Sequence, residues 1–189
     1  MNNTRSCLLL VLFALFCGQS AHAVDAKVQA IFLNMAKLGS LVGKWKADID
    51  FYDRDGKLIK ETADYSVHPT LDGTYLEADV SVWRNDDASK RHGFKIMTTF
   101  NPDTGKYDQT YFYSRWAIRV TETGEFDDAS QEYRTTAFIP LEDGKHDESV
   151  HTTTKFQPNG SVEYWHWSRY DNETTALMNF HAVLKKMHS

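Results

Sequence analysis

Turn-forming residues recur along this chain in a way that restricts it to a protein built of short strands. Clusters rich in Asp, Asn, Gly or Pro lie at residues 53–56, 71–73, 101–105, 122–124, 142–144 and 157–160. Such clusters favour tight turns, and the runs between them are rich in Thr, Val, Tyr, Phe and Trp, which favour strands. Because sequential strands joined by tight turns usually pair with each other, the pattern predicts an antiparallel β protein.

The strand pattern is clearest near the start of this region, where Trp45, Ala47, Ile49 and Phe51 alternate with charged residues. This alternation predicts one buried and one exposed face. An open sheet of this length would leave two unpaired edges, whereas a sheet closed on itself pairs them. We therefore predict an all-β fold, a single antiparallel up-and-down β-barrel of about ten strands. The predicted strands are residues 43–52, 57–67, 73–83, 93–100, 106–114, 115–121, 131–139, 147–156, 160–169 and 174–185.

Helical spacing occurs at both ends of the strand region. Val28, Ile31 and Met35 fall on one helical face and predict a short N-terminal helix over residues 26–37. At the other end, residues 174–187 fit helical spacing and strand alternation equally well, so both interpretations stay open there.

Residues 1–23 are predicted to form a signal peptide. Arg5 provides a positive start, residues 7–17 form an uncharged apolar run, and residues 21–23 form a small-x-small cleavage site. The apolar run is too short to span a bilayer. We therefore expect an exported protein, periplasmic or secreted, in which residues 24–189 form one barrel domain without an integral membrane span.

Composition excludes several classes of partner and chemistry. Both cysteines lie within residues 1–23, so the mature chain has no thiolate or disulfide to use. The formal net charge of −5 argues against nucleic acid as a partner. The sequence also lacks a phosphate-binding loop, a serine-hydrolase elbow and the His spacing of a three-ligand zinc site. We expect neither an enzyme nor a metal centre, and oligomeric state is left open.

Three motifs carry a family resemblance. They are Leu-Val-Gly-Lys-Trp at residues 41–45, Leu-Asp-Gly-Thr-Tyr-Leu at residues 71–76, and the segment 100–107 with its Asn-Pro-Asp-Thr-Gly-Lys turn. Together they resemble lipocalin-like or calycin-like β-barrels, and among these an exported bacterial group defined by a domain of unknown function. The resemblance covers most of residues 38–186. It implies a ten-stranded barrel with an interior lined by side chains, and it implies no particular activity.

Aromatic residues gather in two stretches that provide the candidate ligand contacts. Tyr111 and Tyr113 belong to one stretch, and Trp165 and Trp167 to the other. Barrels of this size can enclose a small ligand. We predict that these four residues hold a small apolar or aromatic molecule, with Arg115 as an optional charged contact. In the alternative interpretation the rings fill the interior, and the protein is a structural or protein-interaction module.

His181 supports a further alternative, haem binding. Its place on the final segment is similar to that of the proximal haem ligand in nitrobindin-type ten-stranded barrels, and one such His can hold a haem in an apolar pocket. The Gly-rich opening and the Tyr-Pro-Thr stretch of that group are absent from this sequence. A cofactor-free carrier is therefore the main expectation, and haem bound by His181 is the alternative.

Overall fold

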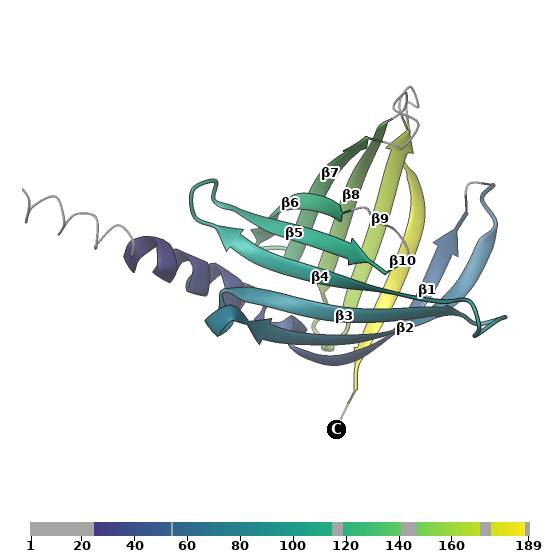
Figure 1. Cartoon of the computed structure of the whole chain (residues 1–189), viewed down its shortest axis with the longest axis horizontal. Helices are drawn as coiled ribbons and strands as arrows, with labels where there is room; N and C mark the ends of the chain where they lie inside the picture. The colour runs from purple at the N-terminus through teal and green to yellow at the C-terminus, as the bar shows by residue number, and fades with distance from the viewer. Residues whose placement is uncertain (1–24, 54, 115–118, 141–146, 171–174, 188–189) are drawn as a thin grey trace, which may run out of the picture.

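Ten strands close into an antiparallel barrel, which confirms the predicted fold class. The computed structural model describes residues 25–53, 55–114, 119–140, 147–170 and 175–187. Each strand pairs with its neighbours in the chain, and the last strand pairs with the first. In Figure 1, β2–β5 cross in front of β7–β10, and the purple N-terminal helix leads to one end of the barrel.

The elements follow one another without a break in topology. The strands are β1 (Gly43–Tyr52), β2 (Leu58–Thr70), β3 (Tyr75–Arg84), β4 (Arg91–Asn101), β5 (Lys106–Tyr113), β6 (Arg119–Asp127), β7 (Glu132–Pro140), β8 (Asp147–Phe156), β9 (Val162–Tyr170) and β10 (Leu177–Lys186). A helix over residues 25–37 and the 3-10 turn η1 (Gly39–Leu41) precede β1, and η2 (Leu71–Gly73) joins β2 to β3. The C-terminal segment is therefore a strand, and it is held as one because it pairs with both β1 and β9.

Most of the predicted turns occur. The clusters at residues 53–56, 71–73, 101–105 and 157–160 each end on a glycine with a positive φ, between 70° and 84°. This left-handed conformation carries no steric cost for glycine. The predicted turn at residues 142–144 lies outside the described residues.

One predicted turn, at residues 122–124, is wrong. β6 runs through it and ends at Asp127, whose carboxylate accepts a hydrogen bond from the Ala129 amide. Gly124 is needed for packing instead, since a Cβ there would lie 2.6 Å from the backbone oxygen of Arg134 on β7. The glycine therefore marks a close approach between strands. The predicted sixth strand, residues 115–121, stopped short of Asp127, where β6 ends.

The N-terminal helix closes one end of the barrel. Met35 and Leu38 are buried there in a cluster with large side chains from β3, β4, β5 and β7, among them Phe100. The Tyr107 hydroxyl donates a hydrogen bond of 2.8 Å to the backbone oxygen of Asn34. A second cluster, formed by small and aliphatic side chains of β1, β2, β3 and β10, lines the barrel wall above this end.

Candidate functional site

The barrel is hollow. It encloses a cavity of about 450 Å³, to which every one of the ten strands contributes lining residues. The cavity extends from Leu38 and Trp45 at the end closed by the helix to Phe51 and Asn179 near the other end. Small-molecule sites typically have volumes of about 300–1,000 Å³. The interior thus has the size of a ligand site, and the interpretation as a solid barrel does not hold for the described residues.

The lining divides into two walls of different chemistry. The apolar wall comes mainly from β1–β4 and β10, and its aliphatic members are Val67, Leu76, Ala78, Val82, Ile96 and Leu184. The polar wall comes mainly from β5–β9, and its members are Gln109, Tyr111, Tyr113, Glu122, Tyr133, Thr154, Tyr164 and His166. A guest in this cavity therefore meets mainly hydrocarbon on one side, with a few polar groups, and mainly hydrogen-bonding groups on the other. The polar members of the first side include Glu61, His92, Thr98 and Asn179.

Hydrogen bonds along the polar wall form a belt that converges on Glu122. The Gln109 amide donates to the Tyr111 hydroxyl at 2.5 Å, and the Tyr111 hydroxyl donates to Glu122 Oε2 over a long 3.5 Å. From the other side, the Thr135 hydroxyl donates to the same oxygen and is itself hydrogen-bonded to the Thr152 hydroxyl. The donors on both sides point toward the carboxyl group, so the belt is built around an acceptor.

Burial changes the ionisation of Glu122. Its residue exposure is only 3%. Loss of hydration raises its pKa to about 7, and the hydrogen bonds from Thr135 and Tyr111 offset only part of this effect. No Lys or Arg occurs among the described residues that line the cavity. At neutral pH the carboxyl group is therefore close to its titration midpoint.

Three tyrosines lie near this carboxyl group. The pKa values of Tyr111, Tyr113 and Tyr164 are raised by burial first and by the negative charge of Glu122 second. The rings of Tyr111 and Tyr113 are stacked, with centroids 6.2 Å apart and planes 10° apart. Because these hydroxyls keep their protons at neutral pH, they act as hydrogen-bonding groups and not as bases.

Three further polar groups in the cavity are uncharged at neutral pH, and two of them contain an atom without a hydrogen-bond partner among the described residues. Burial lowers the pKa of His166 to about 4, so its imidazole is uncharged at neutral pH. The Asn179 Oδ1 atom and the Tyr133 hydroxyl are buried and have no hydrogen-bond partner within the described part of the chain. Such buried, unpaired atoms are costly unless a ligand or water satisfies them.

The structure places two of the predicted ligand contacts in the cavity. Tyr111 and Tyr113 both line it, and the Phe94 ring lies beside them with centroid separations of 6.3 and 5.5 Å. Arg115 lies outside the described residues. Contact between a ligand and these two tyrosines stays a prediction, and the cavity that they line is the place where such a contact would occur.

The two tryptophans point the other way. Val162, Tyr164 and Ser168 face inward on β9, so the intervening Trp165 and Trp167 lie on its outer face. The expectation that they share a cavity with the tyrosines of β5 is therefore corrected. Alternation defines two rows on such a strand, but it does not say which row is buried.

His181 also lies on the outer face. Its ring stacks on Trp165 with centroids 5.4 Å apart, and its Nε2 atom is 3.7 Å from a Glu163 carboxylate oxygen. A haem on His181 would need an apolar pocket open to the imidazole nitrogen. Trp165 covers the ring and a carboxylate faces the nitrogen, so these residues do not fit a haem at His181.

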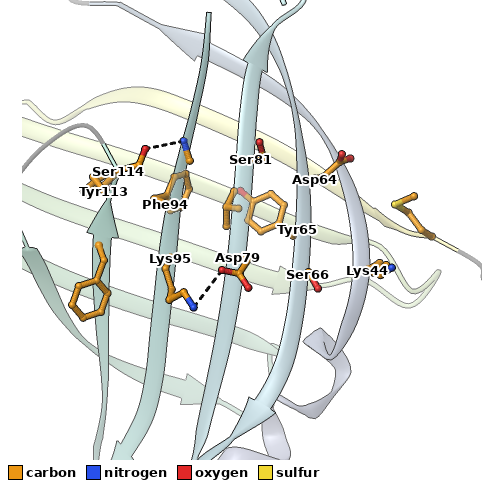
Figure 2. A pocket seen from close by; sticks show the side chains of 14 residues that line it. Lys44, Asp64, Tyr65, Ser66, Asp79, Ser81, Phe94, Lys95, Tyr113 and Ser114 are labelled. Carbon is orange, nitrogen blue, oxygen red and sulfur yellow. Dashed lines mark hydrogen bonds and ion pairs between the residues drawn. The ribbon is translucent and has the colours of Figure 1, made fainter.

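A second hollow, of about 670 Å³, lies against the outer side of β2–β5 (Figure 2). One of its lysines, Lys95, forms an ion pair with the adjacent Glu77 and lies 3.4 Å from Asp79. The same two carboxylates and His68 form the one group within the described ranges that has metal-site spacing. Since the Lys95 ammonium already lies beside both carboxylates of this group, the outer hollow is a weaker candidate than the interior.

Glu122 was not among the site residues predicted from the sequence. The signal was present, because Glu122 lies directly opposite Gln109 in the pairing of β5 with β6, on the face that carries Tyr111. The erroneous turn at residues 122–124 concealed this pairing. If the predicted strand had continued through Gly124, alternation would have placed the Glu122 carboxyl group inside the barrel.

These observations define a closed ten-stranded antiparallel barrel with a hollow, half-polar interior. Its fold is similar to the crystal structure of Rv2717c from M. tuberculosis, with a TM-score of 0.64, 12% sequence identity, and coverage of 82% of this chain and 97% of that chain. At this identity the likeness concerns the fold alone. No protein-family model matches the chain, and no curated protein matches its sequence. Where the structure is described, it contains no helix with the length and hydropathy of a membrane span.

Proposed function

We propose that the protein is a small-molecule binding or carrier protein that holds one apolar or aromatic ligand inside the barrel. The observation that carries this proposal is the cavity of about 450 Å³ between an apolar and a polar wall. Burying hydrocarbon against the apolar wall contributes about 25 cal/mol per Å². The few polar groups opposite then fix the orientation of the ligand, as in other small-molecule sites.

The motifs at residues 41–45, 71–76 and 100–107 resemble those of lipocalin-like barrels, and this resemblance is consistent with a side-chain-lined interior while implying no particular activity. We also propose that the protein acts outside the cytoplasm, after cleavage behind Ala23. Mass spectrometry of the exported protein is expected to give a chain that begins at Val24. A cytoplasmic product that retains residues 1–23 would contradict this part of the proposal.

The cavity is tested with N-phenyl-1-naphthylamine, an uncharged fluorescent probe that brightens when it leaves water. Titration of the protein into the probe is expected to give a saturable, blue-shifted emission with one site per chain. Weak, unsaturable emission would mean that the interior does not accept a guest, and it would remove the basis of the proposal.

Two matched substitutions on β3 separate the interior from the outer hollow. Ala78 lines the cavity, whereas Ser81 lines the hollow on the outer face. Ala78→Phe is expected to weaken probe binding at least about tenfold, equivalent to about 1.4 kcal/mol, and Ser81→Phe to leave it unchanged. The reverse result would assign the ligand to the outer hollow. Circular dichroism confirms the fold of each variant, and Val82→Phe is a second interior substitution.

A further inference from the structure

The polar wall of the cavity offers acceptors to a ligand. The donors of Tyr111 and Thr135 are already directed at Glu122 Oε2. The other carboxyl oxygen, Oε1, accepts none of the hydrogen bonds formed among the described residues. Asn179 adds a buried Oδ1 acceptor without a partner in the same part of the chain. A ligand that satisfies these two acceptors must therefore bring donors, whereas the unpaired Tyr133 hydroxyl can donate or accept.

The charges in the cavity also favour a ligand that brings donors, and in particular a cation. Glu61 and Glu122 both line it, burial raises the pKa of each, and the neighbouring Arg84 offsets this effect only for Glu61. The described lining contains no Lys or Arg, and His166 is neutral at neutral pH. A buried carboxylate without a cationic partner gains strongly when a cation is placed beside it.

Aromatic rings complete the surroundings of Glu122. Tyr111 and Tyr113 are near enough for the carboxylate charge to raise their pKa values, and Phe94 packs against both rings. Faces of such rings attract ammonium groups within about 6 Å of their centroids. A carboxylate beside several aromatic rings is a suitable environment for a protonated amine.

We propose that the ligand is a compact amphipathic amine, whose protonated nitrogen pairs with the Glu122 carboxylate while its hydrocarbon or aromatic part lies on the apolar wall. This inference rests on the proposed function, because it names the ligand class of the same cavity. An alcohol of equal size keeps the apolar contacts but lacks the charge. A carboxylic acid of equal size is repelled by Glu122.

Amine binding is coupled to proton release. A cation beside Glu122 favours its charged form, so the proton that the free protein carries below pH 7 leaves on binding. At pH 6 this amounts to about 0.9 of a proton per site, and at pH 8 to about 0.1. The other titratable groups around the cavity are Tyr111, Tyr113, Tyr133 and Tyr164 on the polar wall with His166, and Glu61, Tyr65 and His92 across from them. The Glu122→Gln variant isolates the contribution of Glu122 from theirs.

The test uses 4-phenylbutylamine, 4-phenylbutanol and 4-phenylbutanoate, which share one hydrocarbon part. Their affinities are measured at pH 7.5 by displacement of N-phenyl-1-naphthylamine. The amine is expected to bind at least about tenfold more tightly than the alcohol, as a hydrogen-bonded charge pair predicts, and the carboxylate most weakly. Calorimetry at pH 6, in buffers of different ionisation enthalpy, measures the released proton.

Variants locate the charge that the amine meets. Glu122→Gln is expected to remove both the preference for the amine and the proton release, so that the amine and the alcohol bind with similar affinity. Loss of the preference in Glu61→Gln instead would overturn the assignment to Glu122. Equal binding of amine and alcohol would overturn the inference and leave the proposed function standing. If neither the fluorescent probe nor any of the three compounds binds, the proposed function and the inference both fail.

Discussion

Replacing Glu122 by Gln is expected to change how the stability of the protein depends on pH. Burial raises the pKa of this carboxyl group from 4.5 to about 7, and a difference of this size corresponds to about 3 kcal/mol. Between these two pH values the native protein keeps a proton that the unfolded chain has lost. The contribution of Glu122 to the free energy of unfolding therefore falls as pH rises through this window, and its loss is nearly complete by pH 8.

The expected difference is measured by urea unfolding at pH 5, 6, 7 and 8, followed by tryptophan fluorescence. From pH 5 to pH 8 the wild type should lose about 2.5 kcal/mol relative to Glu122→Gln. Only the change of this difference with pH is used, because the amide also alters the hydrogen bonds. Glu125→Gln, at an exposed position of the same strand, is the control and should parallel the wild type. Parallel curves for Glu122→Gln and the wild type would refute the reasoning.

Three further predictions follow from the packing and burial. Burial lowers the pKa of His166 from 6.5 to about 4, so the wild type should lose about 3 kcal/mol relative to His166→Gln as pH falls through that window. Urea unfolding measures this difference, and parallel acid limbs for the two proteins would contradict it. Gly124→Ala should lower the free energy of unfolding by about 1–3 kcal/mol through overpacking. The control Gly39→Ala, which has open space around the added Cβ, should change it by less than about 0.5 kcal/mol. Equal urea midpoints for the two variants would count against this prediction. Trp165→Ala should leave the affinity for N-phenyl-1-naphthylamine unchanged, and Tyr113→Ala should weaken it about fivefold, roughly 1 kcal/mol. The opposite order of effects would mean that the probe binds on the outer face of the barrel beside Trp165.

The fold was predictable from the sequence because its local signals agree with one another. Turn clusters such as residues 101–105 and 157–160 set the hairpins, and alternation from Trp45 onward set a buried face. The final segment was ambiguous from its own residues. It became a strand through pairing with β1, which is distant in the sequence, and with β9, the strand before it. Local pattern alone does not contain that information.

The candidate site was predictable only in part. Tyr111 and Tyr113 were placed correctly on one face, because β5 alternates cleanly. Trp165 and Trp167 were placed on the wrong side, because β9 carries large side chains in both of its rows. Glu122 was missed, because a glycine that accommodates a neighbouring strand has the same sequence signature as a glycine in a turn. Distinguishing these cases requires the register between strands.

The site proposed for the amine lies in the interior of the barrel. A crystal structure of the protein grown with 4-(4-bromophenyl)butylamine tests it directly, since the bromine position is located by its anomalous signal. We predict a single bromine site against the apolar wall, with the amine nitrogen within hydrogen-bonding distance of the Glu122 carboxylate. A bromine in the hollow outside β2–β5, or an interior without bromine, would contradict the claim.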